Sequence, residues 1–488
     1  MKLREPQSAA VSRPFRKKRG KDGAPSQQSG AVSHPSRKDK SAARVGHPSL
    51  PPTEPHLVEI EKPIYGGAFL ARLEGKAVFV PLTLPGEKAR VRITEDKRGY
   101  ATAEAEGIVA ASANRIAPAC PHFGACGGCH YQHAKYEAQL AFKQTILRET
   151  LERGGVAAPA EIGMLDGEPW RYRNRIRVAF DASGNPGYRG RRSHAVIPVS
   201  ECPIAAPLLV NTAKAAAEAV RQLAPALRPA GIELFCDASE TAVLASVFVS
   251  NAAQLSPAKM GADFDDFAQA VSVRIPALKG AELVAEGRAG DRVHARSPHA
   301  VAQWGAASLT YRAAGFDYRV DHGAFFQVNR FLVDGLVDLV AANRKGELAW
   351  DLFAGVGLFA RRLTASFARV VTVESEPAAT QALSANLKGT TGTAVRSTTL
   401  DFLRGTRKGQ RPDLIVVDPP RAGLGPEITA LLAEIAAPVL VYVSCDPATL
   451  ARDLRALILS GYAIESITLA DLFPQTFHLE TVVQLRRS

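Results

Sequence analysis

The chain has 488 residues and a formal net charge of +12 at neutral pH. A chain of this length is expected to form about two to four domains with a large buried core. It has no apolar run of membrane-spanning length and no secretory signal with a hydrophobic centre, so we expect neither membrane insertion nor secretion. Six cysteines are too few for a disulfide scaffold at this length. We therefore expect a cytoplasmic monomer whose thiols bind metal or take part in catalysis.

The positive charge is concentrated at the N-terminus. Residues 1–48 contain twelve Lys or Arg residues and three acidic residues, a net charge of +9, which leaves +3 for the rest of the chain. Residues 1–50 are rich in Ser, Gly, Pro and Ala and are predicted to form a disordered basic tail. This tail could hold nucleic acid through phosphate contacts, or it could be a solubilising extension without a specific partner. A transit peptide fits less well, because Gly and Pro interrupt any amphipathic helix.

Residues 51–112 have the pattern of a small β-barrel. Between Leu57 and Val109, short β-type runs alternate with Gly and Pro turns, which indicates about five strands. A basic face would favour RNA binding, although a purely structural barrel would have much the same pattern. Four residues would form that face: Arg90, Arg92, Lys97 and Arg98.

Three thiols follow the predicted barrel in the spacing C-x5-C-x2-C: Cys120, Cys126 and Cys129. Glycines between them allow a tight loop, and the spacing predicts a metal or cluster site. A closed site needs a fourth ligand, for which Cys202 is the best candidate because it precedes a proline in a predicted turn. Three histidines are rival ligands that would favour zinc: His122, His130 and His133. Spacing alone does not separate zinc from an iron–sulfur cluster.

Residues 113–320 are predicted to form a mixed central domain around this loop. An amphipathic helix is expected from Lys135 to Arg153, where Gly154-Gly155 would end it, and an Ala-rich helix near 205–226. Cys236 has the pattern of an ordinary buried strand cysteine.

Four arginines occupy alternate positions in this central region: Arg171, Arg173, Arg175 and Arg177. In a strand they would project from one face at about 6–7 Å intervals, close to the phosphate spacing of a single nucleic-acid strand. We interpret them as an RNA-contact strand, with a solvated strand face as the alternative.

Residues 321–488 have the pattern of a cofactor-binding α/β domain. A strand at Leu348–Asp351 leads into the glycine turn Gly355-Val-Gly357, and the next strand ends at Glu374, which could hold ribose hydroxyls. The glycine pattern alone would also suit NAD. Asp351 is placed to meet a methionine ammonium, and the strand ending in Asp418-Pro-Pro is typical of nucleic-acid methyltransferases. Together these features favour S-adenosylmethionine as the cofactor.

Cys445 lies where an apolar strand, Pro438 to Val443, meets a predicted helix with Asp446 as N-cap and Pro447 as first residue. Ligands bind at that edge of an open α/β sheet, and a helix N-terminus stabilises a thiolate. From this segment alone, Cys445 is equally well explained as a small buried residue.

Several segments together resemble the RNA uracil-C5 methyltransferase family, whose members make 5-methyluridine. The resemblance extends from about residue 55 to the C-terminus and includes these motifs: Phe325-Phe-Gln-Val-Asn329, Asp351-Leu-Phe-Ala-Gly-Val-Gly357, Asp418-Pro-Pro-Arg-Ala-Gly423, Ser444-Cys445-Asp-Pro447 and Phe473-Pro-Gln-Thr-Phe-His-Leu-Glu480. The barrel resembles a TRAM domain, an RNA-binding module. The implied fold is a Rossmann-like catalytic domain preceded by an OB-like barrel and a mixed central domain.

The resemblance also implies roles for individual residues. In relatives the four-cysteine site carries a [4Fe–4S] cluster, which makes zinc the weaker alternative. Members with both TRAM domain and cluster resemble the 23S ribosomal RNA enzymes, whereas the tRNA branch typically lacks both. Five residues would line the S-adenosylmethionine pocket: Gln327, Phe353, Glu374, Asp401 and Asp418. Leu358 departs from the family, because relatives often have Asn there and use its side chain for a contact.

The chemistry of uracil gives the remaining residues a function. C5 is too weak a nucleophile to take a methyl group until a thiolate has added to C6, and Cys445 is suited to that addition. Asp418 would help to position the base, and Glu480 would remove the C5 proton. The target uridine must leave its stack, and three aromatic residues could take its place: Tyr172, Phe325 or Phe326. A non-catalytic RNA-binding protein is the alternative, but retention of Cys445, Asp418 and Glu480 together argues against it.

Overall fold

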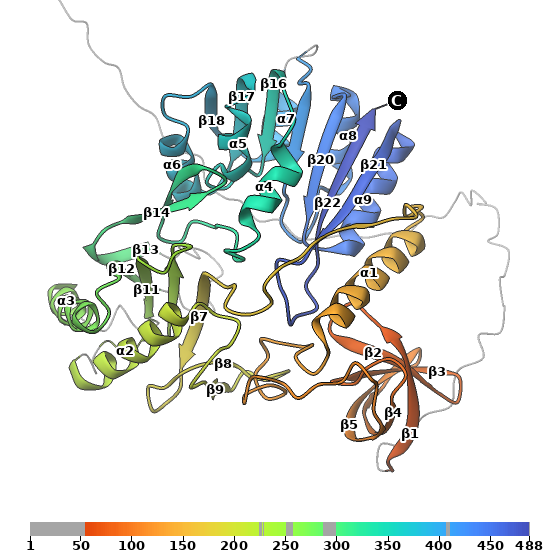
Figure 1. Cartoon of the computed structure of the whole chain (residues 1–488). Helices are drawn as coiled ribbons and strands as arrows, with labels where there is room; N and C mark the ends of the chain where they lie inside the picture. The colour runs from red at the N-terminus through yellow and green to blue at the C-terminus, as the bar shows by residue number, and fades with distance from the viewer. Residues whose placement is uncertain are drawn as a thin grey trace, which may run out of the picture. The chain divides into compact units, whose positions relative to one another are not determined.

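The structure is a computed structural model that describes residues 54–487, except 224–226, 228, 250–256, 286–298 and 407–409 (Figure 1). The predicted basic tail, residues 1–50, lies outside these described residues. Within them, no helix is long and apolar enough to cross a membrane.

The first described module is a closed β-barrel with strand order β1-β2-β3-β5-β4 (Figure 1). Its strands are β1 (His56–Pro63), β2 (Ala68–Leu73), β3 (Lys76–Pro81), β4 (Lys88–Asp96) and β5 (Tyr100–Ala110). Burial alternates along β4, where Ala89, Val91 and Ile93 face the core while Arg90 and Arg92 are exposed. The predicted five-stranded barrel is therefore confirmed.

Helix α1 (Tyr136–Arg153) connects the barrel to the C-terminal part of the chain. It ends at Gly154, as predicted, and its Leu147 and Leu151 side chains lie in the core of the C-terminal sheet. A fully buried ion pair between Lys143 Nζ and Asp471 Oδ1, 2.5 Å apart, fixes the helix to the loop after β21 (Tyr462–Ala470). A buried charge pair of this kind holds one arrangement, because either partner left alone would be costly.

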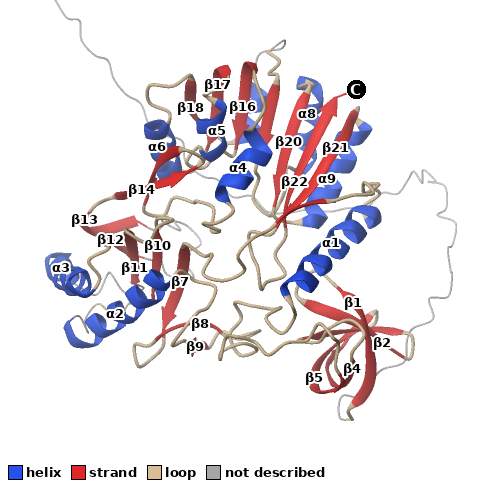
Figure 2. Cartoon of the chain, in the orientation of Figure 1, coloured by secondary structure: helices blue, strands red, loops and turns tan. Residues whose placement is uncertain are grey.

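The central region forms a seven-stranded sheet with strand order β13-β12-β11-β10-β7-β8-β9. Helices α2 (Pro207–Leu223) and α3 (Pro257–Arg274) pack on it through one apolar core (Figure 2). The buried Cys236 belongs to that core, as expected. The strands are β7 (Arg175–Phe180), β8 (Pro186–Arg189), β9 (Val196–Pro198), β10 (Gly231–Cys236), β11 (Val243–Val249), β12 (Leu278–Ala285) and β13 (His299–Gly305).

The prediction of one strand face carrying four arginines is wrong. Strand β7 begins only at Arg175, and Arg171 has a left-handed backbone (φ 53°), so the alternation does not extend over all four residues. Arg175 Nη1 donates to Glu233 Oε1 at 2.6 Å, and the Arg173 guanidinium is buried over the Phe473 ring. Only Arg171 and Arg177 are exposed. Partners within the protein therefore engage the guanidinium groups of Arg173 and Arg175.

The hairpin β14 (Ser308–Ala313) and β15 (Phe316–Asp321) leads into an eight-stranded sheet with order β18-β17-β16-β19-β20-β22-β21-β6. Strands β16 to β20 are parallel, whereas β22 runs antiparallel to β20. The remaining strand bounds are β6 (Gly163–Leu165), β16 (Gly346–Leu352), β17 (Phe367–Glu374), β18 (Gly392–Arg396), β19 (Leu414–Val417), β20 (Val439–Ser444) and β22 (Glu480–Arg487).

Helices cover both faces of this sheet, as in a doubly wound fold. One face packs against α4 (Val333–Ala341), α5 (Leu358–Leu363) and α6 (Pro377–Asn386). The other packs against α1, α7 (Thr399–Gly405), α8 (Gly425–Ile435) and α9 (Pro447–Leu459). The predicted Rossmann-like α/β fold is confirmed. Chain order reverses between β16 and β19, and ligands bind outside the carboxyl ends of the strands at such a point.

Candidate active site

Three predicted catalytic residues lie at one edge of the eight-stranded sheet. Asp418 follows the carboxyl end of β19, and Cys445 follows the neighbouring β20. Strand β22 is antiparallel to β20, and its Thr481 pairs with Ser444, so Glu480 at the start of β22 lies at the same edge. The fold thus brings together a thiol and two carboxylates from separate segments.

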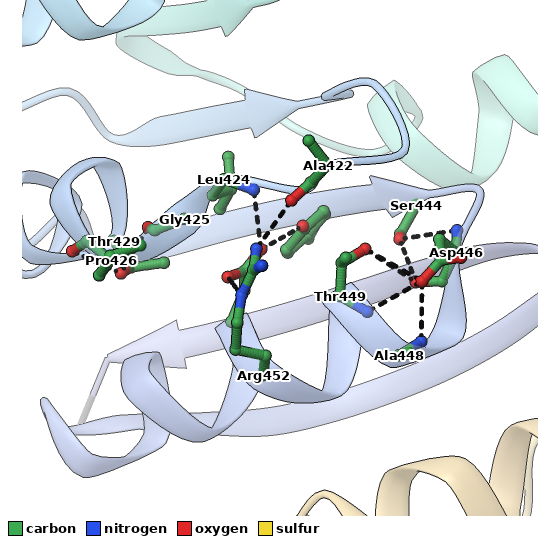
Figure 3. Close-up of polar contacts among 12 residues, drawn as sticks. Ala422, Leu424, Gly425, Pro426, Thr429, Ser444, Asp446, Ala448, Thr449 and Arg452 are labelled. Carbon is green, nitrogen blue, oxygen red and sulfur yellow. Dashed lines mark hydrogen bonds and ion pairs between the residues drawn. The ribbon is translucent and has the colours of Figure 1, made fainter.

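The turn after β20 is held by hydrogen bonds at the start of α9 (Figure 3). Asp446 Oδ1 accepts from the backbone N–H groups of Ala448 and Thr449 at 3.0 and 2.9 Å, as expected of an N-cap. Thr449 Oγ1 donates to the carbonyl of Arg421 at 3.2 Å, which connects this turn to the loop after β19. Cys445 is therefore fixed between a capped helix and the Asp418-Pro-Pro-Arg421 segment.

The environment of Cys445 disfavours the thiolate in the free protein. Burial, with the negative charges of Glu480 and Asp418, raises the pKa of Cys445 to about 12, against a smaller lowering by Arg421. We expected the helix N-terminus to stabilise a thiolate, but in this environment the thiol holds its proton at neutral pH. A nearby base is consequently needed before the thiol can react.

The two carboxylates are candidates for that base. Burial raises the pKa of the half-buried Asp418 to about 7. The pKa of Glu480 is also raised, first by burial and then by the charge of Asp418. The positive charge of Arg421 lowers the pKa of Glu480 in part. Arg421 Nη2 lies 3.3 Å from His478 Nδ1. Two acids whose pKa values lie above the ordinary carboxyl range are suited to proton transfer near neutral pH.

The glycine turn after β16 has the geometry of a cofactor loop. Phe353 is held in a left-handed conformation (φ 63°), which is uncommon for an aromatic residue and is found at functional sites. Glu374, at the end of β17, accepts from the N–H of Gly355 through Oε2 at 2.9 Å. Its Oε1 accepts from the backbone N–H groups of Ser375 and Glu376, each at 2.7 Å. Phe353 and Glu374 therefore both lie at the glycine turn, at the ends of the neighbouring strands β16 and β17.

Asp351 is fully buried beneath this turn. Its Oδ2 accepts from the N–H of Ala360 at the start of α5, and its Oδ1 has no hydrogen-bond partner among the described residues. Burial, with smaller contributions from the charges of Asp418 and Glu374, raises the pKa of Asp351 to about 8. A buried, half-satisfied carboxylate at this point can accept a hydrogen bond from a bound ligand.

The other two predicted cofactor residues have different surroundings. Gln327 is buried, and its backbone carbonyl accepts from Asn174 Nδ2 at 2.9 Å. Asp401 is exposed in the first turn of α7, where it accepts from Thr398 Oγ1 at 2.6 Å in a capping arrangement. A capping function explains Asp401 without any ligand, so its assignment to the cofactor stays a prediction. Leu358 is buried and packs in the core of the sheet.

A residue of the barrel also reaches this site, which the sequence pattern did not reveal. The Tyr65 hydroxyl forms a hydrogen bond with Asp446 and lies within the electrostatic influence of Cys445. The Tyr65 ring packs edge-to-face on Phe477, with the ring centroids 5.5 Å apart. Gly66 and Gly67 follow with φ values of 107° and 86°, which only glycine adopts readily. An aromatic residue before Gly-Gly is too common a pattern to have identified it.

Of the three aromatic residues proposed to replace the flipped base, Tyr172 and Phe326 are buried. Phe325 is 59% exposed and is the only one of the three that a base could reach without rearrangement.

Four thiols from two segments line one cavity of about 70 Å³: Cys120, Cys126, Cys129 and Cys202. Burial raises the pKa of Cys129 to about 12, and the neighbouring thiols raise it further. Arg173 also lines the cavity, and its buried Nε has no hydrogen-bond partner within the described part of the chain. In the described part of the chain, however, no group of three or more His, Cys, Asp or Glu side chains is arranged to hold a metal ion. The predicted metal site therefore gains no support from ligand geometry.

The rival histidine ligands have other partners. His133 Nε2 lies 3.1 Å from the carbonyl of Thr83, and His122 Nε2 lies 3.3 Å from Ser200 Oγ. The His130 ring packs against Phe477, with the centroids 4.6 Å apart.

Comparison with known proteins gives two family matches. Residues 405–488 match the tRNA (uracil-5-)-methyltransferase model, and residues 56–105 match the TRAM domain model. An RNA methyltransferase of Thermotoga maritima described as uncharacterised is 32% identical, over 88% of this chain and 98% of that protein. The 23S rRNA (uracil(1939)-C(5))-methyltransferase RlmD of Halomonas elongata is 32% identical, over 86% and 87%.

A solved structure shares the fold. The Pyrococcus abyssi tRNA (uracil-54, C5)-methyltransferase, determined with S-adenosyl-L-homocysteine, matches with a TM-score of 0.68. The match covers 88% of this chain and 100% of that chain, at 23% sequence identity.

Proposed function

This chain belongs to the family of RNA uracil-C5 methyltransferases, and we propose that it methylates C5 of a specific uridine in 23S ribosomal RNA. Its donor is S-adenosylmethionine. The ribosomal substrate is supported by the 32% identity with the Halomonas elongata 23S rRNA enzyme over most of both chains. It is also supported by the combination of a TRAM barrel with four cysteines around one cavity.

One observation carries the proposed chemistry: Cys445, Asp418 and Glu480 meet at the edge of the sheet where the glycine turn also lies. A thiol alone would explain only a buried cysteine, and a pair of acids alone would suit many reactions. Together they provide a nucleophile for C6 and bases for two proton transfers, one before the addition and one after methyl transfer.

The proposed reaction begins with transfer of the Cys445 proton to Asp418, which leaves Glu480 ionised for the later step. The thiolate forms a bond to C6 of the flipped uracil, and the C5–C6 electron pair moves onto C5 and O4 as an enolate. C5 then takes the methyl group that S-adenosylmethionine would supply, and the sulfur–methyl bond breaks to leave S-adenosylhomocysteine. Glu480 accepts the C5 proton, the C5–C6 double bond forms again, and the Cys445 sulfur leaves as thiolate.

The proposed cofactor pocket consists of five residues: Gln327, Phe353, Glu374, Asp401 and Asp418. Glu374 carries the best support, because three backbone N–H groups hold its carboxylate beside the glycine turn in a position to meet ribose hydroxyls. Asp351 adds an unpartnered buried oxygen beneath the same turn, which a methionine ammonium could engage.

For the four cysteines we propose a [4Fe–4S] cluster, with zinc as the weaker alternative. Each thiolate of such a cluster binds a different iron, so the sulfurs stand farther apart than the ligands of one ion. The cavity of about 70 Å³ supports this, since one water-sized body needs only roughly 10–15 Å³. Arg173 could donate its unpartnered N–H toward an anionic cluster.

The proposed division of labour has three parts. The barrel at 51–112 holds RNA, the central part at 113–320 carries the cluster and further RNA contacts, and residues 321–488 perform the chemistry. All six cysteines are free, which suits the reducing cytoplasm where ribosomal RNA is found.

The decisive experiment maps 5-methyluridine in ribosomal and transfer RNA from cells with and without this gene. We expect one position in 23S rRNA to lose its methyl group. Loss only from tRNA would overturn the ribosomal substrate while leaving the chemistry intact. A 5-fluorouridine RNA tests the chemistry itself, because C5 then lacks the proton that Glu480 must remove and the adduct with Cys445 should persist on a denaturing gel. A protein that binds RNA without forming that adduct would refute the covalent mechanism.

A further inference from the structure

A groove of about 660 Å³ lies where the barrel, the cysteine loop and the central sheet meet. The barrel contributes the turn Gly66–Ala68, and the cysteine loop contributes Gly127, Gly128 and His130. The central sheet contributes Arg177 of β7 and the segment 187–192. None of the predicted catalytic or cofactor residues lines this groove.

The charge of this groove is one-sided. Among the described residues that line it there are four arginines and no aspartate or glutamate: Arg177, Arg189, Arg191 and Arg192. Two other surface grooves of similar size differ in this respect. The one of about 860 Å³ includes Glu168 and Glu201, and the one of about 690 Å³ includes Asp338 and Glu465. The first groove is thus the one suited to a polyanion.

Two of the four arginines fix the groove in place. Arg191 binds Glu104 of the barrel in a bidentate pair, with contacts of 3.1 and 2.6 Å, and Arg192 Nη1 lies 3.3 Å from the same carboxylate. These contacts join the barrel to the central sheet and set the distance between the two walls. The two walls are therefore already positioned before a ligand binds, so binding does not include the free-energy cost of ordering them.

The other two arginines offer charge and a stacking surface. The Arg177 guanidinium lies over the Phe248 ring at 3.9 Å from its centroid, which orients the cation flat against the floor of the groove. Arg189 is exposed, and its Nη1 donates to the carbonyl of His194. Oriented arginines beside aromatic surfaces are typical of sites that bind single-stranded RNA.

The groove ends at the aromatic cluster beside the catalytic thiol. His130 lines the groove, and its ring centroid lies 4.6 Å from that of Phe477. The Tyr65 ring also contacts Phe477, with the two centroids 5.5 Å apart. The Tyr65 hydroxyl in turn forms a hydrogen bond with Asp446, which follows Cys445 in the chain. This series of contacts connects the groove to the segment that carries Cys445.

We propose that this groove binds the sugar–phosphate backbone of the single-stranded RNA segment adjacent to the target uridine. The proposal rests on the proposed function, because it assigns to that RNA a second binding site beside the catalytic one. The aromatic cluster of Tyr65, His130 and Phe477 separates the two sites, so that the flanking nucleotides stay in the groove while the uridine reaches the thiol.

The test removes the two arginines that offer charge and a stacking surface, Arg177 and Arg189. Arg177→Gln and Arg189→Gln, singly and together, are compared with wild type by fluorescence anisotropy on a labelled ten-nucleotide oligouridine at several salt concentrations. We expect the slope of log affinity against log salt to fall by about 0.7 for each arginine removed. With 23S rRNA from cells lacking the gene, KM should rise about tenfold for the double variant, while kcat stays within about twofold. Unchanged circular dichroism and melting temperature confirm that the double variant is folded.

Arg312→Gln is the matched control, because Arg312 is 74% exposed on β14, outside the groove, and forms a surface pair with Asp317. It should change neither the salt slope nor KM. A double variant with wild-type slope and KM would overturn the groove proposal. Methylation of a uridine by the wild-type protein would still support the proposed function in that case. If wild type itself forms no 5-methyluridine, the proposed function fails instead, and the oligouridine slope still reports on the groove.

A cross-linking measurement locates the RNA directly. 23S rRNA transcripts with 4-thiouridine next to the methylated position should cross-link to peptides containing residues 127–130 or 187–192. Cross-links confined to other peptides would also overturn the proposal. Peptides that line the groove containing Glu168 are among these.

Discussion

Cys445 and Cys129 are both partly buried thiols, and burial raises the pKa of each to about 12. Their neighbours differ. Cys445 faces two carboxylates, Glu480 and Asp418, whereas Cys129 faces three other thiols. A carboxylate with a raised pKa can take the proton of a thiol and return it within one catalytic cycle.

The thiols around the other cavity mainly face one another, with Glu201 as the one carboxylate among its described lining residues. Close packing of several thiolates would be strongly unfavourable, so the cysteines around the 70 Å³ cavity ionise together only when a cation compensates them. We propose that the same residue type serves as a nucleophile in one place and as a metal ligand in the other because of its neighbours. Each of the following measurements breaks or sharpens that contrast.

Removing the nucleophile should have the largest effect. Cys445→Ala should lower methyl transfer by at least about 10³-fold, because C6 addition has no substitute, while RNA affinity stays unchanged. The measurement is transfer of labelled methyl groups from S-adenosylmethionine to 23S rRNA. Cys236→Ala is the matched control: its thiol is buried in the core of the central sheet, and the variant should keep its activity. Full activity of Cys445→Ala would refute the assignment.

Removing the proposed base should stop the reaction after methyl transfer. Glu480→Gln keeps the side-chain volume but cannot accept the C5 proton, so we expect turnover to fall by about 10²–10⁴-fold. The covalent adduct between Cys445 and the methylated RNA should accumulate and appear as a retarded band on a denaturing gel. Slow turnover without such a band would place Glu480 before the addition step rather than after it.

Removing a thiol of the other group should affect metal content and stability instead of chemistry. We expect Cys126→Ala to lose iron, sulfide and the broad visible absorption band of anaerobically purified protein, and to lower the melting temperature by several degrees. Wild-type protein that contains zinc and no such band would favour the zinc alternative.

Neutralising a carboxylate beside Cys445 should lower the pKa of that thiol. Glu480 and Asp418 raise it through their negative charges, so Asp418→Asn should shift the pH dependence of Cys445 alkylation by iodoacetamide to lower pH, by about one unit. The alkylation profile of Cys129 should not move, because its pKa is raised by burial and by other thiols. Equal shifts at both cysteines would indicate a general loosening of structure.

The smallest expected effect concerns stability and pH. Burial raises the pKa of Asp351 to about 8, well above that of an unfolded aspartate, so the folded state holds the proton more tightly. This contribution is fully present below about pH 4 and is lost as pH rises through about 8. Asp351→Asn removes the titration and keeps an acceptor for Ala360, so its melting temperature should fall less between pH 5 and pH 9 than that of wild type. An equal fall in both proteins would contradict the raised pKa.

Local signals predicted several elements well. The apolar run and the Asp446-Pro447 pair placed β20 and the start of α9 to within one residue, and Gly154 correctly marked the end of α1. These features act through neighbours in the chain: a cap satisfies the N–H groups two and three residues later, and proline suits only the first turn. The barrel followed in the same way from short β-type runs and Gly or Pro turns.

The arginine segment shows where such reasoning fails. Alternate spacing predicted a common exposed face, but the left-handed backbone of Arg171 and the partner of Arg175 depend on residues far away in the sequence. For the same reason the pattern could not reveal Tyr65, which meets Asp446 across some 380 positions of the chain. It also predicted a stabilised thiolate at Cys445, because the approach of Glu480 and Asp418 was not visible.

The sequence by itself therefore determined the family, the order of modules and the residues capable of chemistry. Tertiary structure decided which of these residues meet, how burial moves their pKa values, and which arginines face solvent. The physical reason is that propensities, caps and motifs act over a few residues. Desolvation and Coulomb interactions, in contrast, depend on distances that only the packing of remote segments sets.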